Sequence, residues 1–159
     1  MSNLENKLKK IIHAFNNINR DIAFKDIKKL SEKYNNNISV QNILYQISMK
    51  VGDIDTSINA LKKILFVDKN NISYLSQLYK LLLRKGLHDQ ALEKINSILE
   101  IDNKNYEALR DKSYIYYLKK DYIEAKKYIE NISNLKDDDY FGYNIKGLIY
   151  FKNKWSIYR

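Results

Sequence analysis

The chain has no cysteine, no proline and only four glycines among its 159 residues. The lack of cysteine excludes disulfides, zinc–thiolate centres and cysteine nucleophiles. Proline and glycine are the strongest helix breakers, so their scarcity predicts long helices with short connections. The two histidines, His13 and His88, stand in no metal-ligand spacing, and the isolated glycines form no phosphate-binding loop. We therefore expect no catalytic site, no metal and no cofactor.

Long apolar runs are missing as well. No stretch approaches the roughly 18 apolar residues that a membrane span needs, and the polar opening residues contain no signal-peptide core. We expect no membrane association and a cytoplasmic location. Hydrophobic residues nevertheless make up 45% of the chain and charged residues 30%, a composition that supports a packed core.

The net charge of +9 would suit an anionic partner, but its distribution disfavours nucleic acid. Residues 4–37 hold eight basic and four acidic side chains, and residues 140–159 hold four basic and no acidic ones. Residues 106–139 hold seven basic and eight acidic side chains. A nucleic-acid site favours a contiguous basic track, which this separation does not provide.

A repeat of constant period runs through the chain. The small residues Ala23, Ser57, Ala91 and Ala125 recur at equal intervals. Each is followed four and seven positions later by a large aliphatic side chain, which places all three on one helix face. The same helix is therefore predicted four times in one register. The aliphatic pairs are Ile27 and Leu30, Leu61 and Ile64, Ile95 and Ile98, and Ile129 and Ile132.

Another amphipathic helix precedes each of these, and a short breaker separates the two. We expect Gly52 and Gly86 to end helices in the left-handed conformation, and Asp53 and Asp121 to accept hydrogen bonds from the first free amides of the next helix. Polar clusters of residues typical of turns and helix caps separate successive helix pairs. These clusters are Asn35-Asn36-Asn37, Asp68-Lys69-Asn70-Asn71, Asp102-Asn103-Lys104-Asn105 and Asp137-Asp138-Asp139.

This pattern resembles the tetratricopeptide repeat, a helix-turn-helix unit of about 34 residues with characteristic large and small places. The interval from Ala23 to Ser57 has the same length. The resemblance implies an all-α, right-handed α-solenoid of antiparallel helix pairs with about nine to ten helices. We expect a single solenoid domain over residues 1–159, and we number the places within each unit from its first residue. The units are 4–37, 38–71, 72–105, 106–139 and a partial one, 140–159.

The sequence departs from the family at several places. Lys7 and Gln41 stand where the family has tryptophan, and Lys10, Lys112 and Lys146 stand where it has leucine. The first helix of the first unit fits worst, so we expect a divergent cap there. The fifth unit has Gly147 and Tyr150 in family places, but its second helix is expected to have barely begun at Arg159. Phe151, Trp155, Ile157 and Tyr158 would then be uncovered, either because the chain is a fragment or because another chain covers them.

The resemblance also implies a binding surface. In similar proteins, places 2, 5, 9, 12 and 13 of the first helices line a concave groove that holds an extended peptide or a partner helix. Basic residues mixed with tyrosine at these places suit an acidic peptide that carries an apolar side chain; the alternative is that they are solvated residues of an exposed face. The candidates are Asn42, Gln46, Lys80, Arg84, Arg110, Tyr114 and Tyr117, with Phe141 at the same face in the fifth unit.

The function expected from these features is a protein–protein interaction scaffold. One alternative is an N-terminal repeat region of a larger bacterial enzyme of the sulfotransferase or glycosyltransferase type, with the catalytic domain beyond this chain. Another is self-association through the C-terminal unit. The sequence itself does not identify the partner.

Overall fold

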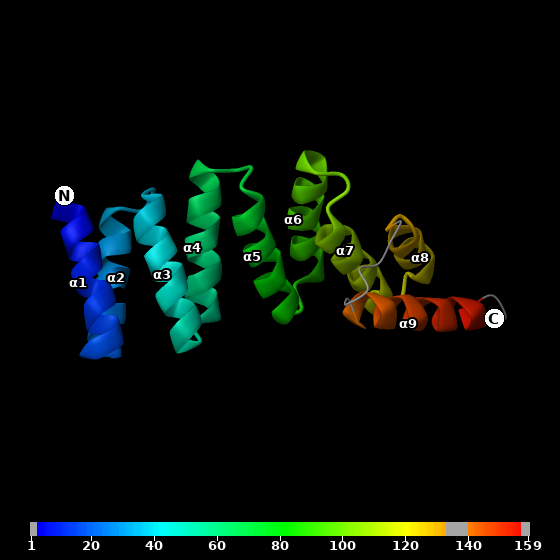
Figure 1. Ribbon diagram of the computed structural model, residues 1–159, viewed down its shortest axis with the longest axis horizontal. Coiled ribbons are helices and arrows are strands. Elements are labelled where there is room, and N and C mark those ends of the chain that lie inside the picture. The colour runs from blue at the N-terminus through cyan, green and yellow to red at the C-terminus, as the bar shows by residue number, and fades with distance from the viewer. Residues whose placement is uncertain (1–2, 133–139, 157–159) are drawn as a thin grey trace. The chain divides into compact units, whose positions relative to one another are not determined.

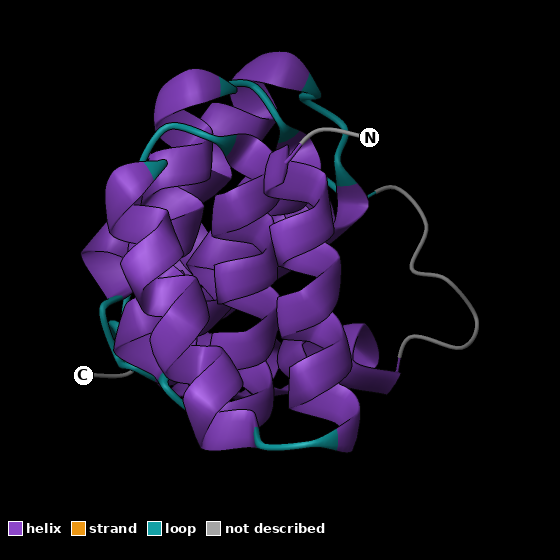
Figure 2. Cartoon of the chain, turned by 90° about the vertical axis from the view of Figure 1, so that its left-hand side faces the viewer, coloured by secondary structure: helices purple, strands orange, loops and turns teal. Residues whose placement is uncertain are grey.

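The fold comes from a computed structural model, which describes residues 3–132 and 140–156, with the side chains of the last helix described up to Lys152. Within these residues the secondary structure consists of nine α-helices, with no strand (Figures 1 and 2). The all-α solenoid expected from the repeat is confirmed. The helices are α1 (Asn3–Asn17), α2 (Arg20–Lys33), α3 (Ile38–Val51), α4 (Ile54–Val67), α5 (Ile72–Arg84), α6 (His88–Ile101), α7 (Tyr106–Leu118), α8 (Tyr122–Glu130) and α9 (Tyr140–Ser156).

Helix starts recur at the spacing of the sequence repeat. Helices α3, α5, α7 and α9 begin at Ile38, Ile72, Tyr106 and Tyr140, and α1 begins one residue before Leu4. The second helix of each pair, from α2 to α8, also starts at this constant interval. The small residues Ala23, Ser57, Ala91 and Ala125 are all completely buried, as close packing between helices requires.

Asparagine and aspartate side chains begin most of these helices. Asn37, Asn71 and Asn105, which are themselves spaced by one repeat, each accept a hydrogen bond from the backbone N–H three residues later. Asp53 and Asp121 do the same at the starts of α4 and α8, as the sequence predicted. Each cap satisfies one of the amides that a helix N-terminus leaves free.

Left-handed residues end the first helix in three of the pairs. Gly52 has a φ of +82° and Gly86 a φ of +71°, as expected for glycine at a helix C-terminus. The corresponding residue between α7 and α8 is Lys120, with a φ of +65°. A side chain with a Cβ is strained in this region.

The chain forms two compact units, Met1–Leu82 and Leu83–Arg159, and each is described by itself. In the first unit, α1, α2 and α3 share a hydrophobic core with a residue of α4. In the second, α8 and α9 pack on each other, and tyrosines of α7 cover their contact. The first core contains Leu8, Ile11, Phe15, Ala23, Ile27, Val40, Leu44, Ile47 and Ala60; the second contains Ala125, Ile129, Ile132, Ile145 and Ile149.

Two polar residues at apolar family places are buried with hydrogen-bond partners. The Gln41 Nε2 donates to the backbone carbonyls of Ser31 and Tyr34 at the C-terminal end of α2, at 3.2 and 3.4 Å. The Lys112 Nζ donates to Asn96 Oδ1 at 2.7 Å and lies 4.3 Å from the centre of the Tyr128 ring. These contacts satisfy the Gln41 Nε2 and the Lys112 ammonium, whereas the Gln41 Oε1 is buried with no hydrogen-bond partner.

The packing stripe of α1 differs from the family stripe. Its buried side chains are Leu8, Ile11 and Phe15, whereas Lys7 and Lys10 are exposed. The buried face is therefore rotated by about one residue relative to α5, in which the expected residues Leu75 and Leu78 are buried. The first helix is divergent, as its poor fit predicted.

Helix α9 is longer than the other first helices, and the expected beginning of a second helix near Arg159 lies outside the described residues. The helix continues through Ser156, although the preceding first helix, α7, stops at Leu118, which corresponds to residue 152. The places of Gly52 and Asp53 are taken here by Lys154 and Trp155, so neither a favourable left-handed residue nor a capping side chain is present.

The buried face of α9 also differs from the expected one. Ile145 and Ile149 are buried, whereas Tyr150, which was matched to a packed family place, is 40% exposed. Gly147, at another family place, is exposed as well. Expectations for Asp137-Asp138-Asp139 and for the side chains of Trp155, Ile157 and Tyr158 fall outside the described residues.

Candidate binding surface on the first helices

Titratable side chains in the described residues form no cluster that could hold a metal ion, since no three or more His, Asp or Glu side chains come together there in a suitable way. His13 is exposed on α1, and His88 is the first residue of α6 rather than part of the preceding turn. None of the described helices has the length and apolar character required to cross a membrane.

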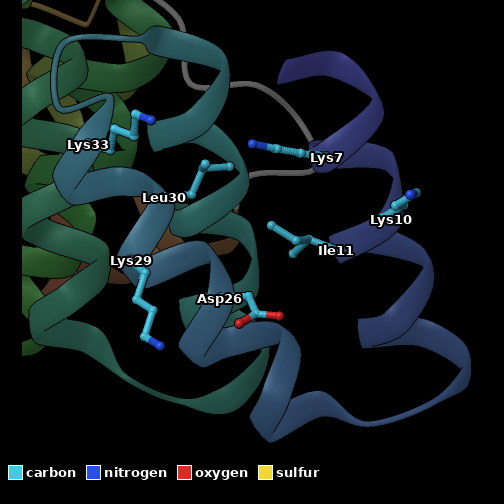
Figure 3. A pocket seen from close by; sticks show the side chains of 7 residues that line it. All are labelled: Lys7, Lys10, Ile11, Asp26, Lys29, Leu30 and Lys33. Carbon is cyan, nitrogen blue, oxygen red and sulfur yellow. The ribbon is translucent and has the colours of Figure 1, made fainter. Parts of the chain in front are cut away.

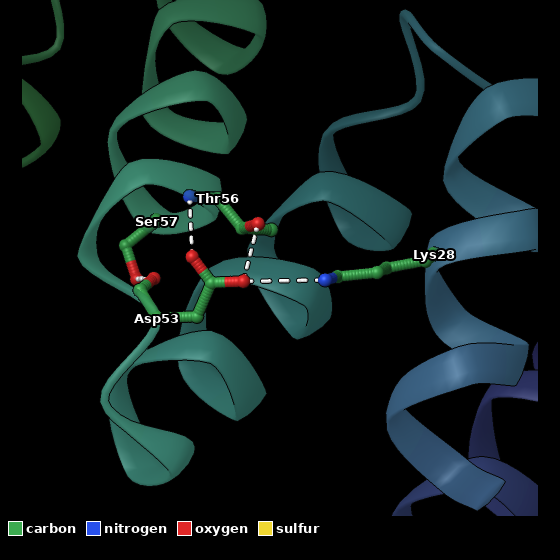
Figure 4. Close-up of polar contacts among 4 residues, drawn as sticks. All are labelled: Lys28, Asp53, Thr56 and Ser57. Atoms are coloured by element: carbon green, nitrogen blue, oxygen red, sulfur yellow. Dashed lines mark hydrogen bonds and ion pairs between the residues drawn. The ribbon is translucent and has the colours of Figure 1, made fainter. Parts of the chain in front are cut away.

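The contacts of Asp53 hold helices together. Its carboxylate accepts hydrogen bonds from the Thr56 N–H at 3.0 Å, the Thr56 hydroxyl at 2.7 Å and the Lys28 ammonium at 3.2 Å (Figure 4). These bonds, led by that from the backbone of Thr56, lower the pKa of Asp53 despite partial burial. The N-terminus of α4 is therefore capped and tied to α2 at the same point.

A second polar contact joins α8 and α9. The Tyr150 hydroxyl donates to Glu130 Oε1 at 2.6 Å, which lowers the pKa of Glu130 and raises that of Tyr150. A hydrogen bond that an anion accepts favours its charged form and disfavours loss of the donated proton. Both groups have structural partners, so neither is placed as an acid or a base for chemistry.

None of the candidate groove residues belongs to the buried core. In the first compact unit, Gln46 and Lys80 are exposed and Asn42 is partly exposed. The second unit contains the remaining four candidates. Arg84 is exposed there, and Arg110, Tyr114 and Tyr117 are partly exposed.

Three of the four candidates in the second unit lie together with Phe141 of α9. The Tyr114 ring meets the Phe141 ring edge to face, with 5.4 Å between centroids, and stacks on the Tyr117 ring at 6.5 Å. The Arg110 guanidinium lies 5.0 Å from the centroid of Phe141. Phe141 is 45% exposed. We call Arg110, Tyr114, Tyr117 and Phe141 the aromatic patch.

The charge of Arg110 is shared with a neighbouring carboxylate. Its Nε donates to Asp111 Oδ1 at 2.9 Å, and the side chains of the two residues are only 17% and 8% exposed. The guanidinium also lies 6.0 Å from the centre of the Tyr106 ring. Arg110 therefore contacts the ring of Phe141 while its own charge is paired with Asp111. The sequence did not predict this pairing, because adjacent residues on a helix usually point in different directions.

Comparison with known proteins supports the fold. No family model and no curated protein sequence matches the chain. A solved tetratricopeptide repeat protein from Parabacteroides merdae is 17% identical, with a TM-score of 0.76, over 94% of this chain and 60% of that one. The MamA fragment 41-end from Desulfovibrio magneticus RS-1 is 11% identical, with a TM-score of 0.76, over 97% of this chain and 88% of that one.

A chain of a solved protein complex is also similar in fold, with a lower TM-score. The structure of Naa15/Naa10 bound to HypK-THB includes a chain that is 12% identical, with a TM-score of 0.55, over 96% of this chain and 23% of that one. The nine described helices and their regular spacing place this chain among helical-repeat proteins. Within that class, its fold is that of the tetratricopeptide repeat proteins to which it is similar.

Proposed function

We propose that the protein is a non-enzymatic interaction scaffold in the cytoplasm, which binds a peptide or helix of another protein on the groove face of its first helices. The observation that carries this proposal is the aromatic patch on α7 and α9. Rigid, partly exposed rings give a large contact area at a low cost in side-chain entropy, as binding surfaces require. Structures with this fold include a protein complex, which agrees with the proposal.

The chemistry of the patch favours an apolar side chain of the partner. Arg110 is already paired with Asp111, so the rings of Tyr114, Tyr117 and Phe141 provide most of the accessible contact. A preference for acidic residues is assigned instead to Arg84, which is exposed at the end of α5 in the same compact unit as the patch. The partner segment would thus combine an aromatic or aliphatic anchor with acidic residues.

Selection from a library of random peptides tests this function. We expect the wild-type protein to select peptides with a large apolar side chain. The double variant Tyr117→Ser, Phe141→Ser should bind them at least about tenfold more weakly, because a binding surface depends on a few anchoring residues. Ile123→Ser is the control, since Ile123 is 74% exposed on α8 and lies outside the patch.

Circular dichroism must show that the double variant is folded. Equal loss of binding in the double variant and the control, or no loss in either, would contradict the groove assignment. Affinity capture with the intact chain and with the same variants would then identify the natural partner.

We also propose self-association through α9 as an additional property. This helix carries six of the large, exposed hydrophobic side chains, and an apolar surface of this kind is typical of an interface. These are Tyr140, Phe141, Tyr143, Leu148, Tyr150 and Phe151. In the alternative proposal, the same face is covered by a catalytic domain of a larger enzyme that lies beyond this chain.

A further inference from the structure

A basic cavity lies between α1 and α2, two helices that contribute no residue to the aromatic patch. Its volume is about 390 Å³, within the range of binding pockets. Figure 3 shows Lys7 and Ile11 of α1 and Leu30 of α2 extending into the space between the two helices. The residues that line it are Lys7, Lys10, Ile11, Asp26, Lys29, Leu30 and Lys33.

This surface differs from the equivalent surface of α3 and α5. Lys7 and Lys10 occupy places 4 and 7 of their unit. The side chains at these places are buried in α3, as Gln41 and Leu44, and apolar and buried in α5. In the first helix pair, α1 and α2, the same face is exposed and carries basic side chains together with the aliphatic side chains of the lining.

The charge on this face is largely uncompensated. Among the described residues, no ion pair or hydrogen bond involves the side chain of Lys7, Lys10 or Lys29, and the Lys33 ammonium contacts only the Tyr34 ring, at 5.7 Å. The cavity lining contains four lysines and one acid, Asp26. Four lysines against one aspartate give the lining an excess of positive charge, which would attract an anionic ligand.

The geometry of the lining indicates what kind of anion fits. Lys7 and Lys10 lie about one turn apart on α1, and Lys29 and Lys33 lie about one turn apart on α2. Ile11 and Leu30 are the two apolar side chains of the lining, and we call them its floor. A segment that offers carboxylates to both lysine pairs and an aliphatic side chain to the floor matches the cavity in charge and polarity. A small inorganic anion would leave the floor unused.

We propose that the α1–α2 cavity is a second docking site, which binds an acidic segment of a partner protein that contains leucine or a similar aliphatic residue. The site shares no residue with the aromatic patch.

A peptide titration tests the site. The probe is a fluorescein-labelled peptide of twelve residues in which leucines are flanked by pairs of aspartates. Two matched peptides replace every Asp by Asn or every Leu by Ser. We expect the acidic leucine peptide to bind more tightly than either, with an affinity that falls as salt rises. Amide chemical shifts should change in residues 7–11 and 26–33.

Charge reversal links the binding to the cavity. The double variant Lys7→Glu, Lys29→Glu should raise the Kd of the acidic leucine peptide by about tenfold or more, because like charges now face each other. The control Lys62→Glu, Lys69→Glu changes the net charge equally at two exposed lysines outside the cavity. It should change the Kd by less than about threefold, as the effect of distant exposed charges is screened. Thermal melts of both variants check that they are folded.

Three results would overturn the proposal. Equal weakening by both double variants would show non-specific charge attraction. Equal affinity of the peptide with Ser in place of Leu, together with its displacement by inorganic tripolyphosphate, would show a small-anion site. Chemical-shift changes confined to α7 and α9 would place the peptide on the aromatic patch. The Tyr117→Ser, Phe141→Ser variant separates the two sites, because it should leave this binding unchanged.

Discussion

At the scale of single residues, the turn between α7 and α8 contains the strained position Lys120. Its φ of +65° lies in the region that Gly52 and Gly86 occupy at the equivalent turns. For a residue with a Cβ, this conformation costs about 1–2 kcal/mol relative to glycine. The greater flexibility of glycine in the unfolded chain offsets part of that cost.

We predict that Lys120→Gly stabilises the protein by about 0.5–1 kcal/mol, as relief of left-handed strain outweighs the added entropy of the unfolded chain. Urea unfolding followed by circular dichroism would measure this change. The matched reverse substitution is Gly86→Ala, which should destabilise. A Cβ at Gly86 would meet no atom within 4 Å, so its effect would report conformational strain alone. Destabilisation by Lys120→Gly would contradict this account.

At the scale of helices, Asp53 connects the N-terminus of α4 to α2. Its pKa is lowered chiefly by the hydrogen bond from the Thr56 N–H, with smaller contributions from the Thr56 hydroxyl and Lys28. Because the pKa is lower in the folded state, this stabilisation is fully present above the unfolded value, about 3.9. It is lost as the pH falls through the lower folded value.

We predict that the wild-type protein loses more unfolding free energy than Asp53→Asn as the pH falls from about 5 to about 2. Asparagine keeps a capping oxygen but has no charge to titrate. Lys28→Met should reduce the pH dependence only in part, since the bond from Thr56 remains. Urea unfolding at a series of pH values gives the three slopes. Identical slopes for the wild type and Asp53→Asn would refute the role of this carboxylate.

The sequence predicted which segments form helices better than which faces they bury. Fixed spacing of Ala23 and its equivalents identified the second helices, because a buried small residue is a local signal of close packing. The clusters that contain Asn37, Asn71 and Asn105 were predicted to form turns and caps, and the structure identifies these three asparagines as the capping residues. Asparagine is common in all turns, so its residue type alone does not distinguish a cap.

Which face of a helix is buried depends on the elements that pack against it. In α1 the buried face consists of Leu8, Ile11 and Phe15, and in α9 it contains Ile145 and Ile149. Both faces differ from the expected stripe. A hydrophobic pattern shows that a helix is amphipathic, but the elements that pack on it select the covered side. The groove candidates lie outside the buried core, and their binding role stays a prediction. The α1–α2 cavity was not foreseen, since its lysines appeared only as departures from the family pattern.

At the scale of the whole molecule, charge and exposed apolar side chains are unevenly distributed along the chain. The four lysines of the α1–α2 cavity come from the first hairpin, whereas α9 carries the densest set of exposed aromatic side chains. Tyr140 is 82% exposed, Phe151 60% and Tyr143 49%. Apolar side chains gathered on one helix expose more hydrophobic surface in one place than scattered ones do, and such surface favours association.

We predict that the protein associates with itself as its concentration rises, and that Tyr143→Ser, Phe151→Ser shifts this equilibrium toward the monomer. Burial of apolar surface in a contact between copies drives the association, so removal of two exposed rings weakens it. Sedimentation velocity across a concentration series gives the mass of each species. The control is Phe66→Ser, which removes a ring that is 69% exposed on α4 and should leave the equilibrium unchanged. If the wild-type protein stays monomeric at every concentration, the exposed face of α9 does not serve for self-association.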